Sequence, residues 1–106
     1  MQIHNLTTFK GGWVVGDFDP TLLRCRDAEV AIKYYWKGDS EPAHVHRIAD
    51  EVTVVVSGTV IINGETLTTG QIAFIKAGEA ASFSAVTDAT TCVIKSPSIK
   101  GDKYVV

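Results

Sequence analysis

Residues 38–58 read GDSEPAHVHRIADEVTVVVSG, and this stretch decides the fold. It holds two of the chain's three histidines, His44 and His46, and Glu51 follows shortly after them. In an extended strand, residues i and i+2 point to the same face, so both imidazoles face one direction. A short connection then leads to a β-branched run that Glu51 opens. We therefore expect two neighbouring strands that present two imidazoles and a carboxylate to one place.

These three side chains form a set that can hold a metal ion. Two imidazoles and one carboxylate suit first-row divalent metals and leave coordination positions open for water or substrate. An HxH pair by itself favours the simpler interpretation, in which both histidines lie on a solvated strand and Glu51 is a surface acid. His44, His46 and Glu51 could therefore share one ion, and such a ligand set would not select among Fe, Mn, Ni and Zn.

The spacing of the whole stretch is more specific than the HxH pair. Gly38, His44, His46, Glu51 and Gly58 are separated by five, one, four and six residues. This pattern resembles the first conserved motif of the cupin superfamily at every fixed position. The resemblance covers about residues 30–95 and implies an all-β, single-domain cupin-type jelly-roll β-barrel with a metal ion inside its mouth.

The second cupin motif keeps its glycines but not its proline, histidine or asparagine. Gly70 and Gly78 stand at the family's spacing, but Lys76 replaces its proline, Ala81 its histidine and Ala85 its asparagine. The resemblance therefore implies His44, His46 and Glu51 as three of the usual four metal ligands. Three interpretations remain open: a site completed by water molecules, a fourth ligand recruited from elsewhere, or a site that no longer holds metal tightly.

The rest of the chain also predicts an all-β fold. Short β-branched and aromatic runs alternate with glycine turns, and Asn63-Gly64 is the clearest hairpin signal. One helical turn is expected at Thr21–Arg24, because Asp19 can cap it and Pro20 suits a first helical position. The expected strands are 13–17, 30–36, 45–46, 51–57, 60–62, 66–67, 72–75, 81–85 and 91–95, and a further short strand is plausible at the apolar C-terminus.

Length, composition and charge exclude several classes of protein. With 106 residues, 11.4 kDa and no linker or repeat, the chain is expected to form one domain over residues 1–106. Its formal charge of -2 comes from mixed signs without a basic cluster, so we expect neither a nucleic-acid nor a membrane partner. The N-terminus does not resemble a signal peptide, and Cys25 and Cys92 form no CxxC pair, which favours a cytoplasmic protein with reduced thiols.

The run from Val30 to Trp36 supplies candidate substrate contacts. Tyr34 and Trp36 share one face of a strand, and we expect them to be substrate-binding residues, although core or dimer packing is an alternative. Lys76 and the arginines at 24, 26 and 47 could bind an anion, with plain solvation as their default role.

The sequence leaves several functions open. The leading hypothesis is a small metal-binding cupin that acts on a small polar metabolite, such as a sugar or organic acid, as an isomerase, lyase or dioxygenase. The alternative is a non-catalytic ligand-binding or sensor cupin with a degenerate metal site, and a third possibility is a structural domain with a vestigial pocket. The resemblance also implies a homodimer.

Overall fold

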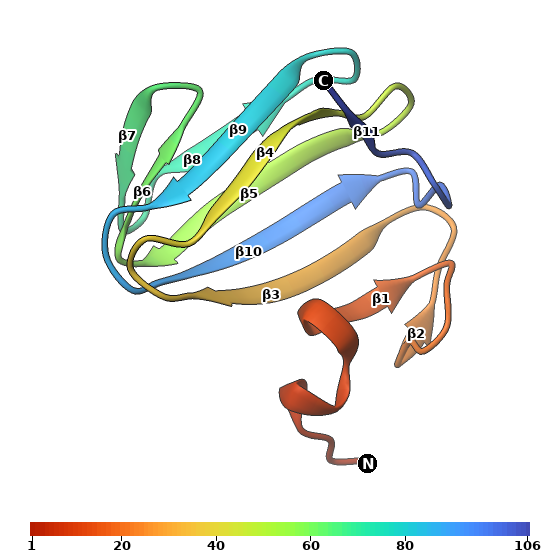
Figure 1. The fold of residues 1–106 in the computed structure, drawn as a ribbon. Helices are drawn as coiled ribbons and strands as arrows, with labels where there is room; N and C mark the ends of the chain where they lie inside the picture. The colour runs from red at the N-terminus through yellow and green to blue at the C-terminus, as the bar shows by residue number, and fades with distance from the viewer.

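A computed structural model describes all residues from 1 to 106 and shows two β-sheets packed face to face (Figure 1). The larger sheet has the strand order β2-β1-β3-β10-β5-β8 and the smaller one the order β11-β4-β9-β6-β7. The all-β prediction is confirmed. The strands are β1 (Trp13–Gly16), β2 (Leu23–Arg24), β3 (Glu29–Tyr35), β4 (Ser40–Val45), β5 (Asp50–Ser57), β6 (Thr59–Ile62), β7 (Glu65–Thr68), β8 (Ile72–Ile75), β9 (Ala80–Ala85), β10 (Ala89–Ser96) and β11 (Tyr104–Val105).

Period-two alternation along each strand builds the space between the sheets. On β5, Glu51, Thr53 and Val55 are buried, while the valines between them are more exposed. The apolar core lies toward the β6 and β8 side of this space and consists of Val55, Val60, Ile62, Ile75, Ala81 and Ala89. The polar side chains at the start of β5 therefore line the other part of the interior, which is where the site forms.

The hairpin between β6 and β7 confirms the turn predicted at Asn63-Gly64. Ile62 pairs with Glu65, so only two residues form the turn. Asn63 and Gly64 have φ angles of 51° and 77°, the left-handed values that such two-residue hairpins need and that Asn and Gly tolerate.

The predicted helical turn at Thr21–Arg24 is wrong, because this segment pairs with β1 instead. Leu23 and Arg24 form β2, which runs parallel to β1 in register with Val15 and Gly16. The backbone N–H of Leu22 and the hydroxyl of Thr21 both donate to the carbonyl of Val14. These tertiary hydrogen bonds outweigh the local capping preference of Asp19 and Pro20.

Both chain ends are anchored to the sheets. The N-terminal segment contains two 3-10 helices, η1 (Leu6–Thr8) and η2 (Lys10–Gly12), and η2 lies beside β3 of the larger sheet (Figure 1). None of the helices is long and apolar enough to cross a membrane. The short C-terminal strand that the sequence suggested is present as β11, which pairs with β4, and Asp102 just before it hydrogen-bonds to His46.

Candidate metal centre

The structure brings His44, His46 and Glu51 together at one end of the space between the sheets. His44 lies near the end of β4, His46 follows the last residue of that strand, and Glu51 is the second residue of β5. One ligand atom from each residue lies within 4.8 Å of the others. The three side chains are 8%, 4% and 9% exposed, so this is a buried cluster rather than the solvated strand of the simpler interpretation.

Hydrogen bonds to backbone carbonyls orient both imidazoles. Nδ1 of His44 lies 3.2 Å from the carbonyl oxygen of Pro42, and Nδ1 of His46 lies 2.5 Å from that of Asp102. A carbonyl oxygen only accepts, so each Nδ1 carries a proton, and in the neutral ring this leaves the lone pair on Nε2. This arrangement, with Nδ1 bonded and Nε2 free, is typical of histidines that ligate metals.

The unpaired Nε2 of His46 indicates that the cluster fits a metal ion. This nitrogen is fully buried and has no hydrogen-bond partner, although it lies 3.4 Å from Oε1 of Glu51. A buried polar atom without a partner is unfavourable, and coordination to a cation would satisfy it. The donor set of two imidazoles and one carboxylate is also chemically suited to a divalent transition metal.

The protonation states of the cluster match those that metal binding needs. Burial lowers the pKa of His44, which keeps its imidazole neutral. Burial alone would raise the pKa of Glu51, but His46, Lys95 and the hydroxyl of Thr53, which donates to Oε2 over 3.1 Å, together lower it. The cluster thus offers a neutral imidazole at His44 and an ionised carboxylate at Glu51 without first having to lose their protons.

Asp102 holds the connection between β4 and β5, the strands that position His44 and Glu51. Its buried carboxylate accepts hydrogen bonds from the backbone N–H groups of Arg47, Ile48 and Ala49 at 2.8–3.1 Å. Burial alone would raise the pKa of Asp102, and these three donors lower it instead. The sequence analysis missed this residue, because Asp102 is more than fifty positions away from the turn that it holds.

No fourth ligand completes the cluster. Ala81 of β9, which stands where the cupin motif has its histidine, pairs directly with His44 and is buried against the cavity. The cluster of His44, His46 and Glu51 has three members, and no other histidine, cysteine or carboxylate joins it. Ala81 therefore leaves space beside the ligands, which favours the interpretation of a three-ligand site with open positions.

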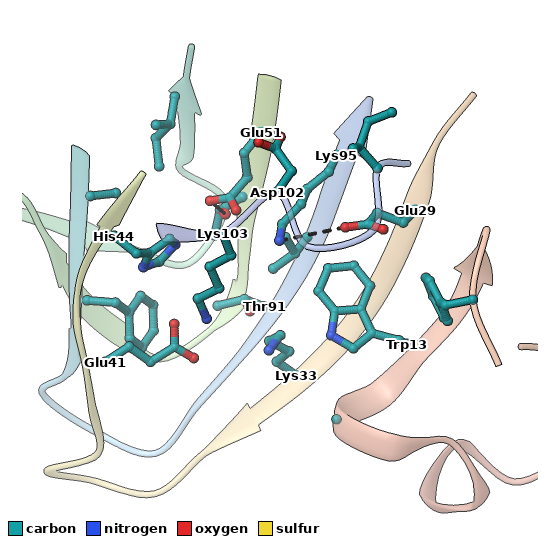
Figure 2. Close-up of a pocket in the computed structure, with 18 of the residues that line it drawn as sticks. Trp13, Glu29, Lys33, Glu41, His44, Glu51, Thr91, Lys95, Asp102 and Lys103 are labelled. Atoms are coloured by element: carbon teal, nitrogen blue, oxygen red, sulfur yellow. Dashed lines mark hydrogen bonds and ion pairs between the residues drawn. The ribbon is translucent and has the colours of Figure 1, made fainter. Parts of the chain in front are cut away.

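A cavity of about 490 Å³ extends from this cluster toward Trp13 of β1 (Figure 2). Its polar lining includes Tyr35, whose hydroxyl donates to Oε1 of Glu41 over 3.1 Å. Burial and the negative charge of Glu41 raise the pKa of the Tyr35 phenol far above its ordinary value. Its apolar lining includes Ile62, Phe83 and Val93. The cavity thus combines a metal-ligating end with a mixed wall, as small-molecule sites do.

The structure does not place Tyr34 and Trp36 at this cavity. Both side chains lie on the outer side of the larger sheet, where they are 68% and 75% exposed. Lys33 and Tyr35 occupy the alternate positions of β3 and point inward. Tyr34 and Trp36, which we expected to bind substrate, therefore do not line this cavity, because the strand turns Lys33 and Tyr35 toward it instead.

The suggested anion-binding residues also lie elsewhere, since neither Lys76 nor any arginine lines the cavity. Arg24, for example, pairs with Asp17 and Asp19 at the surface. The basic residues of the cavity are five lysines that the sequence analysis did not select: Lys10, Lys33, Lys95, Lys100 and Lys103. Lys33 could have been found from the sequence, because strand alternation places it on the same face of β3 as Tyr35.

Comparisons with known proteins identify similar folds. No protein-family model matches the chain, and no curated protein matches its sequence. An uncharacterized conserved protein with a double-stranded β-helix domain from Klebsiella pneumoniae matches with a TM-score of 0.74 and 19% identity, over 99% of this chain and 91% of its own. An RmlC-like cupin from Shewanella frigidimarina matches with a TM-score of 0.66 and 23% identity, over 71% of this chain and 70% of its own.

A third similar structure contains a metal ion. It is the bacterial pirin YhhW from Escherichia coli in complex with nickel(II), with a TM-score of 0.66 and 25% identity. The match covers 82% of this chain and 39% of the pirin, so this chain corresponds to less than half of that protein. At these identities the comparisons establish the double-stranded β-helix as the fold of the chain.

Proposed function

We propose, on the premise that this chain has the cupin fold, that it is a small metal-binding protein that acts on a small polar metabolite in the cavity between its sheets. His44, His46 and Glu51 would hold a divalent ion such as Fe, Mn, Ni or Zn. The metabolite would be a sugar or an organic acid. The reaction types that fit such a centre are isomerisation, elimination and oxygenation.

The buried, unpaired Nε2 of His46 is the observation that carries this proposal. It lies beside the Glu51 carboxylate, and the Nδ1 atom of the same ring is already engaged by the Asp102 carbonyl. A histidine that only stabilised the fold would be expected to use both ring nitrogens or to expose one to water. The presence of nickel in a pirin of similar fold adds support from outside the chain.

Different residues of the site would bind the metal ion, leave room for the substrate and exclude water. A bound divalent ion would supply Lewis-acid polarisation of a substrate oxygen. Glu51 stays ionised and His44 neutral, so both keep their lone pairs for binding. Ala81 leaves room beside His44 for a substrate group, while Phe83 and Val93 keep water from the apolar part of the cavity.

The alternative function is a non-catalytic ligand-binding or sensor protein. It is favoured by Ala81, because a small apolar side chain takes the place of the fourth cupin ligand. A sensor would bind metal and ligand without turnover, whereas an enzyme would release a changed product. Metal-loaded protein incubated with candidate sugars and organic acids, followed by mass spectrometry, separates the two functions.

We also propose that the chain forms a homodimer through the outer face of the larger sheet. Two rows of paired apolar side chains cross this face: Ile72, Val54, Cys92 and Ile32 in one row, and Phe74, Val52, Ile94 and Val30 in the other. Neither row contains a charged residue, so a second copy would meet it without like-charge repulsion. The exposure of Ile72 and Phe74, 59% each, supports a partner at this face.

The cytoplasm is the compartment that we propose for this protein. Cys25 and Cys92 are both unpaired in the fold. Free thiols are typical of proteins kept in a reducing environment. Fractionation of the source cells, followed by detection of the protein with an antibody, tests this assignment.

Elemental analysis of untagged protein purified without chelator tests the metal centre. Parallel samples carry His44→Ala, Glu51→Gln or, as the matched control, His4→Ala, which removes an exposed histidine far from the cluster in the sequence. The proposal predicts near-stoichiometric metal in the parent and in the control, and loss of metal in both cluster variants. Parent protein that stays free of metal even after incubation with iron, manganese, nickel or zinc would contradict the proposal.

A further inference from the structure

The charges that line the cavity are balanced in number but not in pairing. Five carboxylates and five lysines line it. Every carboxylate has a partner within the protein: Asp19 pairs with Arg24, Glu29 with Lys95, Glu41 with the Tyr35 hydroxyl, Glu51 with Thr53, and Asp102 with backbone N–H groups. Among the lysines, only Lys95 forms an ion pair. Four of the five lysines therefore have no carboxylate within ion-pair distance.

Lys95 and Trp13 form a fixed end of the cavity. The Lys95 ammonium lies 3.7 Å from Glu29 and 5.0 Å from the centre of the Trp13 ring. Ser98 donates a hydrogen bond of 2.9 Å to the same carboxylate of Glu29. Lys95 is therefore held by its own partners, and it serves as part of the wall (Figure 2).

Lys33 and Lys103, by contrast, present ammonium groups without a carboxylate partner. Lys33 lies over Trp13, 5.3 Å from the ring centre, and extends into the cavity from β3. Lys103 enters from the segment before β11 and lies between His44 and Trp13 in Figure 2. Burial is the main cause of the lowered pKa of Lys95, and the positive charges of Lys103 and Lys33 lower it further. Both ammonium groups therefore act on the same interior space.

We infer that the cavity binds a small carboxylate-bearing molecule, which Lys33 and Lys103 recognise beside the His44, His46 and Glu51 cluster. This inference rests on the proposed function and narrows its substrate from polar metabolites in general to organic acids. A carboxylate would pair with the free ammonium groups and fill an open position at the cluster, whereas a neutral sugar would leave both ammonium groups unpaired.

The lining favours a carboxylate over a phosphate. Phosphate sites in proteins generally use arginine forks or several convergent backbone N–H groups. No arginine lines this cavity, and no helix begins at the metal cluster. The apolar side chains of Ile62, Phe83 and Val93 suit the carbon skeleton of an organic acid.

Isothermal titration calorimetry on metal-loaded protein tests the inference with paired probes. Acetate, malonate and succinate are compared with acetamide, malonamide and succinamide, which match them in size but carry no charge, and with inorganic phosphate. We expect at least one carboxylate to bind about tenfold more tightly than its amide and more tightly than phosphate. The inference is overturned if every amide binds as well as its acid, or if phosphate binds more tightly than all three acids.

Lysine variants assign this preference to residues. Lys33→Met and Lys103→Met are each expected to weaken carboxylate binding about fivefold, and the double variant about twentyfold or more. Lys76→Met, which removes a lysine outside the cavity, should change binding less than about twofold. Lys33→Gln and Lys103→Gln serve as second variants if a methionine variant folds poorly. Unchanged carboxylate binding in a folded double variant would overturn the assignment.

Metal content measured in the same samples keeps the two proposals apart. Stoichiometric metal without a preference for carboxylates over amides contradicts the inference and leaves the metal centre standing. The protein could instead fail to hold metal and still bind carboxylates in a way that depends on the two lysines. That result supports Lys33 and Lys103 as recognition residues and contradicts the metal centre. The two failures therefore give different results.

Discussion

At the scale of a single residue, Asp102 connects the cluster of His44, His46 and Glu51 to the C-terminal segment. Its carboxylate accepts three backbone N–H groups of the turn at residues 47–49, while its carbonyl accepts the Nδ1 proton of His46. One residue therefore fixes both the connection between β4 and β5 and the ring of one ligand. Such outer contacts set ligand orientation and usually matter for metal affinity.

Asp102→Ala is expected to lower both stability and metal affinity. Removing the carboxylate leaves three N–H groups without their acceptor, which should lower the free energy of unfolding by about 2–4 kcal/mol. Metal affinity should fall about tenfold, because the turn no longer holds His46 and Glu51 in place. Urea denaturation and chelator competition measure the two effects.

The matched control for this prediction is Asp88→Ala. Asp88 is exposed and accepts a single backbone N–H, that of Lys37. Loss of this carboxylate should lower the free energy of unfolding by less than about 1 kcal/mol and leave metal affinity unchanged. Equal losses of stability in the two variants would contradict the role assigned to Asp102.

Tyr35 should make stability fall at alkaline pH. Burial and Glu41 raise the pKa of its phenol above the ordinary value of 10.0, so the unfolded chain loses this proton first. The contribution of Tyr35 is therefore complete below about pH 10 and is lost as pH rises, by at most about 1.4 kcal/mol per pH unit. Urea denaturation at pH 9 to 11 should show a shallower loss for Tyr35→Phe than for the parent.

Tyr34→Phe is the control for the alkaline measurement, since the Tyr34 side chain is exposed on the opposite face of β3. We expect this variant to follow the parent over the same pH range. A parent and a Tyr35→Phe variant with identical pH dependence would show that the Tyr35 phenol ionises equally in the folded and unfolded chains.

The grouping of His44, His46 and Glu51 could be predicted from the sequence, whereas the residues that support it could not. His44, His46 and Glu51 lie close together along the chain, so strand alternation and one short connection bring them together. Asp102 and Lys103 reach the site only through the pairing of β11 with β4, a contact between residues far apart in the sequence. A single sequence carries no local signal for such a contact.

At the scale of elements, the pairing of β4 with β9 places Ala81, rather than a fourth ligand, next to His44. Ala81 stands directly opposite His44 in this pair, and residues opposite one another in an antiparallel sheet have Cβ atoms about 4.5–5.5 Å apart. A histidine at position 81 would therefore place its imidazole next to that of His44. The space beside His44 therefore has two causes: the strand register puts position 81 there, and the residue at this position is a small alanine.

Ala81→His should raise metal affinity by about tenfold or more, because it adds a fourth ligand to the three already present. Competition with a chromogenic chelator measures the change. Ala80→His provides the control, since Ala80 is exposed on the neighbouring position of β9, whose side chain faces away from the interior. Equal affinities in the two variants would contradict the placement of position 81 beside the cluster.

Local signals predicted turns better than they predicted the edge of the larger sheet. Asn63-Gly64 formed its hairpin because the two residues meet the backbone requirement of the turn by themselves. Thr21–Arg24 had helix-start residues before it, yet its backbone hydrogen-bonds to β1. An edge strand of two residues has too little sequence to show alternation, so the local pattern could not reveal it.

At the scale of the whole molecule, the outer face of the larger sheet is the surface that we propose joins two copies into a dimer. A double variant, Ile72→Lys with Phe74→Lys, places two charges on the exposed β8 part of this face. If the face joins two copies, analytical ultracentrifugation should find a dimer for the parent and a monomer for the variant. Stability per chain should change little in a monomer, because both side chains are largely exposed.

The control for this prediction is Leu22→Lys with Leu23→Lys, which alters exposed apolar residues away from β8. We expect this variant to remain a dimer. A parent that sediments as a monomer at all concentrations would contradict the proposed dimer, while leaving the metal centre untouched.

The central claim is that His44, His46 and Glu51 bind one metal ion between the two sheets. An anomalous-difference map from a crystal of metal-loaded protein, recorded at the absorption edge of the metal found by elemental analysis, tests this claim most directly. The predicted result is a single peak bounded by Nε2 of both histidines and the Glu51 carboxylate, with the Nδ1 atoms still bonded to the carbonyls of Pro42 and Asp102. A peak at any other place, or none at this cluster, would contradict the claim.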